Sequence, residues 1–193
     1  MVINTEQTFG NWQDMPAITG PHNQMVLDAT HLVAHWRRCS LSSDFWARYT
    51  ALFIPESVPA GRLRRSDAES VLAYLLNELF ENCAKFSGGP NQRVCYQSWV
   101  GKEELIFQIT NHIIPNNQPP FVKLIAELLE GDPEELYFQK LEENAELDTA
   151  GSGLGYLTLI KDYGIRFGFR FRQVGPESVA VDVQAHLTLS EGE

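Results

Sequence analysis

The feature that most constrains the fold is an alternating pattern near the C-terminal end of the chain. Between 165 and 171 an apolar side chain takes every second position, and arginines take several of the positions between. A turn signal at Gly175-Pro176 separates this run from 179–187, where small and branched apolar residues again recur with a period of two. Because alternate side chains of a strand point to opposite faces, the pattern predicts an antiparallel hairpin with one buried face.

A second hairpin is predicted upstream, where the strand-like runs 93–100 and 104–110 flank a turn at Gly101-Lys102. Between and around the hairpins, apolar residues recur at helical spacing. These helical stretches are 66–86, 121–129, 133–141 and 157–163. We therefore expect an α+β fold, a two-layer sandwich with a mixed, mostly antiparallel sheet and helices on one face.

The first 65 residues are predicted to form a separate, helical segment. Residues 1–21 are polar and rich in turn formers, whereas the spacing from Met25 to Trp36 predicts a helix that ends near Arg37-Arg38. A second short helix is expected through Phe45–Phe53. Tryptophans are enriched at interfaces, so this segment (1–65) is a candidate homodimer or partner contact beside a main domain at 66–193.

Composition narrows the classes of function. The chain of 193 residues carries a formal net charge of −10 and has a pI of about 4.9. Binding to nucleic acid or to an anionic membrane surface relies on clustered basic side chains, so neither partner is expected. The sequence shows no long apolar run and no export signal, which predicts a cytoplasmic protein without a membrane span.

Two short segments predict a ligand site. Within Asn77–Ser87, Glu78, Asn82 and Lys85 lie at spacings of 0, 4 and 7, which places three polar groups along one side of an otherwise apolar helix. The second segment is the loop Gly151-Ser152-Gly153-Leu154-Gly155, which runs into a helix. Backbone N–H groups of such a loop can cradle phosphate at a helix N-terminus. Together the segments predict a nucleotide pocket, although Glu78 and Asn82 alone also fit a solvated helix face.

These residues resemble the GHKL ATPase superfamily, which includes gyrase-type ATPases, histidine-kinase catalytic domains and anti-sigma-factor serine kinases. The match covers roughly 66–189 and is most similar to the anti-sigma serine kinase and SiaB-type branch. The resemblance implies a histidine-kinase-like ATPase fold, with Glu78 as the catalytic base, Asn82 as the Mg²⁺-holding asparagine and Lys85 facing phosphate. It also implies that the ligand is bound by the second glycine box, which consists of Gly151, Ser152, Gly153, Leu154, Gly155 and Thr158.

One motif of that family is altered. The family has Asp-x-Gly-x-Gly after the strand that here ends near Ile109, and its Asp receives the adenine amino group. This chain has Asn111 in place of the Asp and lacks both glycines. An ionised Asp only accepts hydrogen bonds, whereas Asn also donates them, so the base specificity is expected to differ. The nucleotide lid also departs, because 121–146 is predicted to be ordered, acidic helix.

Three functions remain open from the sequence. The first is a protein serine kinase that binds ATP with Mg²⁺ and phosphorylates a STAS-type regulatory partner by positioning and electrostatic stabilisation. The second is a non-catalytic sensor on the same fold, in which FAD or FMN enters the reshaped base site beside Asn111. The third is an interaction module with an empty pocket. We expect a regulatory signalling protein with a nucleotide-type cofactor.

Overall fold

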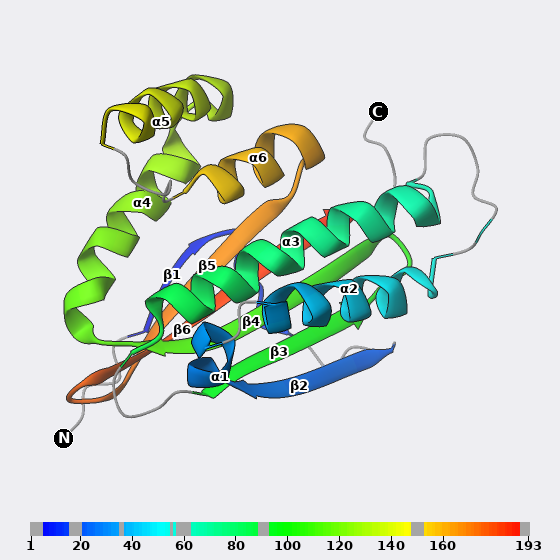
Figure 1. Ribbon diagram of the computed structural model, residues 1–193, viewed down its shortest axis with the longest axis horizontal. Coiled ribbons are helices and arrows are strands. Elements are labelled where there is room, and N and C mark those ends of the chain that lie inside the picture. Colours follow the sequence, from blue (N-terminus) through cyan, green and yellow to red (C-terminus); the bar gives the residue numbers. More distant parts are fainter. Residues whose placement is uncertain are drawn as a thin grey trace.

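An antiparallel six-stranded sheet with helices on one face forms the part of the chain that the structure describes (Figure 1). This computed structural model describes residues 6–15, 21–34, 37–54, 56, 63–88, 93–147 and 153–189. The strands are β1 (Glu6–Gly10), β2 (His22–Asp28), β3 (Arg93–Val100), β4 (Glu104–Ile113), β5 (Arg166–Gly175) and β6 (Ser178–Thr188). The helices are α1 (Ala29–Ala34), α2 (Arg37–Ala51), α3 (Arg65–Phe86), a 3-10 turn (Pro115–Asn117), α4 (Gln118–Glu130), α5 (Pro133–Leu147) and α6 (Leu154–Tyr163).

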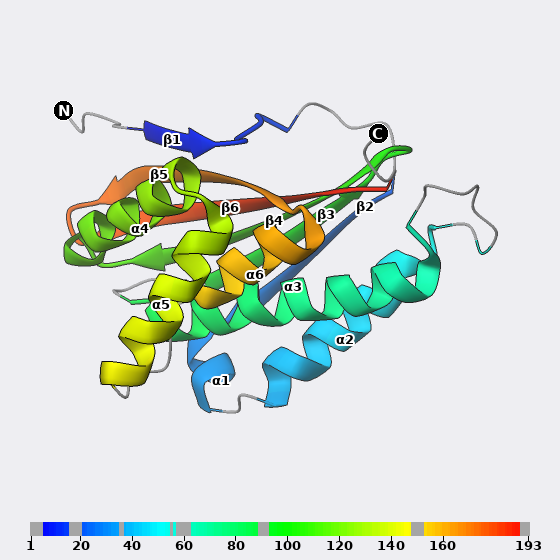
Figure 2. The ribbon, with the colours of Figure 1, turned by 90° about the horizontal axis from the view of Figure 1, so that it is seen from above.

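The strand order is β1-β5-β6-β4-β3-β2, and every neighbouring pair is antiparallel. Both predicted hairpins, β3–β4 and β5–β6, are present, and they lie next to each other through β4 and β6. The helices lie on one side of this sheet (Figure 2). The expected α+β two-layer sandwich is therefore confirmed.

The first 65 residues differ from the prediction because they supply both edge strands of the same sheet. The helix predicted from Met25 is wrong in its first part, since β2 pairs with β3 until Asp28 and α1 begins only at Ala29. Asp28 ends the strand and begins the helix, because its carboxylate accepts hydrogen bonds from the Thr30 backbone N–H and hydroxyl. Likewise α2 begins at Arg37, where the sequence predicted a helix end.

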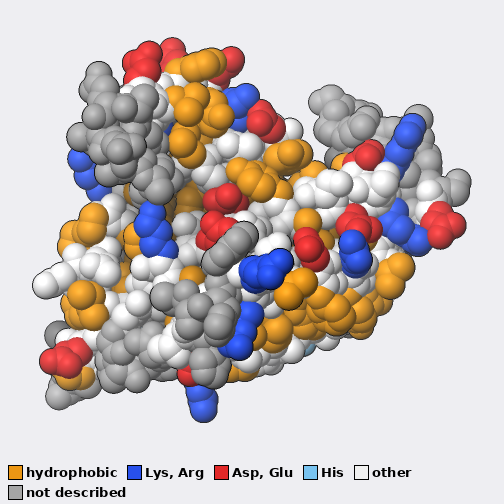
Figure 3. Space-filling view, viewed as in Figure 1, with side chains coloured by type: hydrophobic (Ala, Val, Ile, Leu, Met, Phe, Trp, Pro, Cys, Tyr) orange, Lys and Arg blue, Asp and Glu red, His pale blue; other side chains and the backbone are white. Residues whose placement is uncertain are grey.

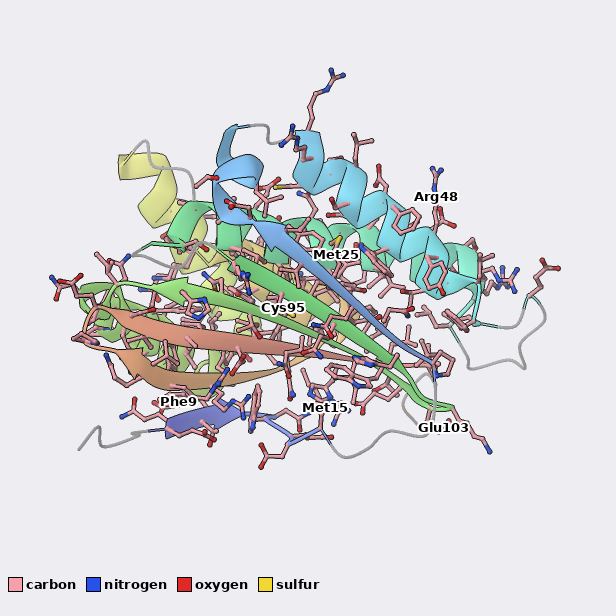
Figure 4. The ribbon with its side chains drawn as sticks, turned by 90° about the horizontal axis from the view of Figure 1, so that it is seen from below. Phe9, Met15, Met25, Arg48, Cys95 and Glu103 are labelled. Atoms are coloured by element: carbon pink, nitrogen blue, oxygen red, sulfur yellow. The ribbon has the colours of Figure 1, made fainter. Side chains whose placement is uncertain are left out.

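Edge strand β2 packs against the rest of the protein with the side chains of one face only. Its side chains alternate between exposed and half-buried, and Met25 lies beneath α2, where its Sδ is 3.2 Å from Nε1 of Trp46 (Figure 4). The spacing of Met25 and Leu27 therefore fits a strand, in which every second side chain packs against the helical layer. Long-range pairing decides the conformation here over local periodicity.

Helix α3 forms the centre of the helical layer. Eight of its side chains are buried, and the largest are leucines and Phe80. They pack on the inner face of the sheet against Tyr96, Phe107 and Ile109, which belong to β3 and β4. Burial of each such leucine or phenylalanine contributes about 1.5–3 kcal/mol, so the packing of α3 on the sheet stabilises the fold.

The outer face of the sheet is polar but also buried. Residues 11–14 cross it after β1, with the Gln13 backbone N–H donating to Oε1 of Gln184 and Nε2 of Gln184 donating to the Gln13 carbonyl. Trp12 lies 4.3 Å from the Arg170 guanidinium. A Cβ on Gly168 would lie 2.5 Å from the Trp12 backbone nitrogen, so only glycine permits this approach.

Two surface regions stand out. Apolar side chains gather over α2 and are exposed there, whereas acidic side chains line the outer side of α5 (Figure 3). The exposed apolar residues of α2 and the turn after it are Leu41, Phe45, Tyr49, Leu52 and Phe53. Among the helices described, none is long and apolar enough to cross a membrane.

Candidate functional site

A cavity of about 380 Å³ opens between the helical layer and the sheet. Its walls come from the C-terminal half of α3, the inner face of β4, helix α4 and the first turn of α6. The volume falls within the range of ligand sites, and most of the lining is apolar. Its principal apolar residues are Leu79, Phe86, Ile109, Ile113, Phe121 and Leu124.

Three predicted residues, Asn82, Asn111 and Gly153, line this cavity together. Asn111 is a polar residue on the apolar face of β4, where it pairs with Val181 and is 5% exposed. Its amide nitrogen donates to the Ser87 hydroxyl at 3.1 Å, so this donor already has a partner. Gly153 has a φ of 95°, which suits glycine, and it allows α6 to start at the cavity wall.

Tyr156 also lines the cavity, and the sequence analysis did not include it. It is 4% exposed and packs edge-on against Phe167, with ring centroids 4.9 Å apart. Its hydroxyl hydrogen-bonds with the Asn82 side chain, and burial raises the pKa of Tyr156 above its ordinary value. The signal available in the sequence was its place directly after the glycine loop.

Glu78, the predicted base, lies outside the cavity wall and against α6. A Cβ built on Gly155 would clash with the Glu78 carboxylate, so the two positions are packed closely. Burial, and secondly the charge of Glu81, raise the pKa of Glu78 above its ordinary value of 4.5. A raised pKa suits a proton acceptor whose working pH is near neutral, although the carboxylate does not face the cavity in this arrangement.

The remaining predicted residues lie at different places. Lys85 is exposed on α3, with its Nζ 5.3 Å from the centroid of the Phe86 ring, and it does not line the cavity. Leu154 is half-buried in the first turn of α6, and Thr158, one turn later, hydrogen-bonds with Tyr74. Gly151 and Ser152 lie outside the described residues.

Charged residues of the two lid helices form one end of the cavity, and the sequence analysis did not single them out. Glu127 of α4 lies between two lysines: its Oε2 is 3.2 Å from Nζ of Lys140 on α5, and its Oε1 is 3.8 Å from Nζ of Lys123. The predicted ordered lid is confirmed as α4 and α5. The signal in the sequence was Lys140, a basic residue within an otherwise acidic helix.

The implied metal ion was Mg²⁺ on Asn82. Mg²⁺ in proteins is usually bound through one or two carboxylates together with substrate phosphates. Among the described residues that line the cavity, Glu127 is the one carboxylate, and it is paired with two lysines. No group of three or more His, Cys, Asp or Glu side chains in the described part of the chain could hold a metal ion. The donor set around Asn82 therefore differs from the one that Mg²⁺ prefers.

Comparison with known proteins shows a likeness in structure but none in sequence. No family model matches the chain, and no curated protein sequence matches it. Among solved structures, it is similar to a chain in the crystal structure of the SiaB–SiaC complex from Pseudomonas aeruginosa, with a TM-score of 0.53. The sequences are 11% identical, and the alignment covers 83% of this chain and 99% of that chain. At this identity the likeness shows a shared fold.

Proposed function

We propose that this chain is a regulatory signalling protein that binds a nucleotide-type ligand in the cavity and acts through a protein partner. The observation that carries the proposal is the meeting of Asn82, Asn111 and Gly153 in one cavity, because they come from three segments that the sequence analysis assigned to one pocket. The shared fold with a chain of a two-protein complex supports the protein partner.

Two forms of this function differ in their chemistry. In the serine-kinase form, Asn82 would hold Mg²⁺ beside ATP, Glu78 would accept the proton of the attacking hydroxyl, and a STAS-type partner would receive the phosphate. Two observations weigh against this form: the Glu78 carboxylate lies outside the cavity wall, and the donor set around Asn82 differs from the one that Mg²⁺ prefers. In this form ATP binding depends on Mg²⁺ and on Asn82. Substitution Asn82→Ala should then abolish Mg²⁺-dependent phosphotransfer, and unchanged activity of the variant would remove the kinase assignment.

The second form is a ligand-sensing switch, and the lining of the cavity favours it. Asn111 stands where an adenine-binding Asp is expected, and its amide donates to Ser87. Phe86, Phe121 and Tyr156 give the cavity an aromatic lining that suits a larger planar ring such as that of FMN or FAD. Partner binding, and not phosphorylation, is the output in this form.

One experiment tests the proposed function directly. The purified protein is examined by ultraviolet–visible spectroscopy, and any ligand released by heat is identified by mass spectrometry. Flavin bands or a released nucleotide support a ligand-binding regulatory protein. If the protein carries no ligand and binds neither ATP, with or without Mg²⁺, nor FMN in calorimetric titrations, the proposal is wrong.

A further inference from the structure

The charged end of the cavity has an arrangement that the proposed function does not yet use. Lys123 and Lys140 come from two different helices and both face Glu127, one lysine at each carboxylate oxygen. Lys140 and Glu127 are each about one-third exposed or less in their side chains, whereas Lys123 is mostly exposed. The carboxylate therefore holds two ammonium groups at the mouth of an apolar cavity.

The charges of this cavity favour an anion. Among its described lining residues, two lysines face one carboxylate, which leaves a net charge of +1. Helix α6 begins directly after Gly153, which lines the cavity, so the N-terminal end of its dipole adds a partial positive charge there. A divalent cation would meet net repulsion here.

The remainder of the cavity suits an apolar, planar body. Leu79, Ile109 and Phe121 supply flat apolar surface, whereas the amides of Asn82 and Asn111 are hydrogen-bonded to Tyr156 and Ser87. A ligand that fills this space places its ring against the sheet and its polar end toward α4 and α5. Glu127 then competes with the ligand for the same two lysines.

We infer that the cavity binds a planar organic phosphate monoester, and that Lys123 and Lys140 hold its phosphate directly, in place of Glu127 and without a divalent cation. This inference rests on the proposed function and deepens it. Lysine binds phosphate as a point charge, and such contacts strengthen where water is partly excluded.

The experiment compares ligands that differ only by the phosphate. Calorimetric titrations of the full chain with FMN and riboflavin, and with AMP and adenosine, are made in EDTA and again with Mg²⁺. We expect at least one phosphate form to bind about tenfold more tightly than its parent, equally with and without Mg²⁺, and more weakly as salt rises.

Variants then test whether these two lysines bind the phosphate or whether any positive charge on the chain has the same effect. The double substitution Lys123→Met and Lys140→Met should abolish the advantage of the phosphate form, because Met keeps the length of the side chain without its charge. Lys102→Met is the matched control, since Lys102 lies exposed in the β3–β4 turn and not at the cavity. Glu127→Gln should tighten the phosphate form several-fold, because the internal competitor loses its charge.

The outcomes distinguish failure of the inference from failure of the proposed function. A phosphate advantage that requires Mg²⁺, that persists in the double lysine variant, or that shrinks in Glu127→Gln overturns the inference and leaves the proposed function in place. Absence of binding for all four compounds, in a wild-type chain shown to be folded by circular dichroism, overturns both.

Discussion

The two faces of the sheet differ in the surroundings of their polar side chains: those of the outer face are paired and covered, whereas those of the helical face border a cavity. On the outer face, Asp182 is 1% exposed and is bound by Arg170, Arg172 and the Thr110 hydroxyl. On the helical face, few polar side chains are buried, and Asn82 and Asn111 stand around a cavity. Residues 11–14 cover part of the outer face, where their backbone lies directly against Gly168 and is hydrogen-bonded to Gln184.

This difference teaches where function should be sought. The outer face has the denser set of charges, and the sequence drew attention to its arginines. Yet those arginines pair with carboxylates of the same sheet, so they stabilise strand pairing. The helical face has fewer polar groups, but they border empty space. Ligand chemistry needs both polar groups and volume, and the helical face combines them at the cavity.

The largest change in stability is expected from removing the buried carboxylate of the outer face. Substitution Asp182→Ala removes the buried carboxylate that binds two partly buried guanidinium groups, although Arg170 keeps longer contacts with Glu6 and Asp14. It should lower the free energy of unfolding by about 3 kcal/mol. Urea unfolding followed by circular dichroism measures it. Asp162→Ala is the control, because Asp162 pairs with Lys161 on the surface, and its loss should leave the free energy of unfolding almost unchanged. Equal effects of the two variants would contradict the comparison.

The next effect concerns the close packing behind the cavity. Gly155→Ala introduces a Cβ where the Glu78 carboxylate lies, so the end of this side chain must turn away. The higher helix propensity of Ala offsets part of the strain, and the net destabilisation should be about 1.5 kcal/mol. In a Glu78→Ala background the same substitution should be neutral or stabilising by up to about 1 kcal/mol, because the obstructing group is gone and Ala favours the helix. A double-mutant cycle in urea measures the coupling, and additive effects would show that the two positions do not touch.

A smaller effect tests the hydrogen bond at the cavity wall. Tyr156→Phe removes the hydroxyl that bonds with Asn82 and should lower stability by about 1 kcal/mol. It also leaves the Asn82 amide without this partner. If Lys123 and Lys140 hold the phosphate as inferred, binding of FMN or AMP stays independent of Mg²⁺ in this variant. Appearance of Mg²⁺ dependence would instead indicate that Tyr156 masks a metal site.

The smallest effect concerns pH on the outer face. Burial lowers the pKa of His186 below its ordinary value of 6.5, although Glu104 opposes the shift and Arg166 supports it. The folded state therefore binds this proton less readily than the unfolded state, so stability is present above pH 6.5 and is lost as the pH falls below it. In His186→Gln this loss should be smaller, because the substituted side chain does not titrate. Identical pH profiles of unfolding would contradict the assignment.

Much of the fold could be predicted because its signals are local. The β3–β4 and β5–β6 hairpins follow from a period of two with turn residues between, and α3 follows from a wide apolar stripe. Edge strand β2 could not, because Met25, Ala29 and Leu32 fit helical spacing equally well. Pairing with β3 and packing under α2 settle that segment, and both partners are distant in sequence.

The candidate site divides in the same way. Asn82, Asn111 and Gly153 were predicted from motifs, and they meet at one cavity. Glu78 and Lys85 were predicted from the same helix, yet neither lines the cavity, because spacing along a helix fixes a face but not what packs against it. Tyr156 and the charged residues of α4 and α5 were missed, because their local signals, a place after the glycine loop and one lysine in an acidic helix, do not say which side chains border a void.

The sequence by itself determined the α+β class, both hairpins, the helical lid and the acidic balance of the chain, because hydrophobic period and turn chemistry act over a few residues. The tertiary structure decided that the first 65 residues supply both sheet edges, that the arginines of β5 pair within the sheet, and that Glu127 sits between two lysines. These features depend on contacts between residues far apart in the chain, and such contacts are fixed only when the whole core packs.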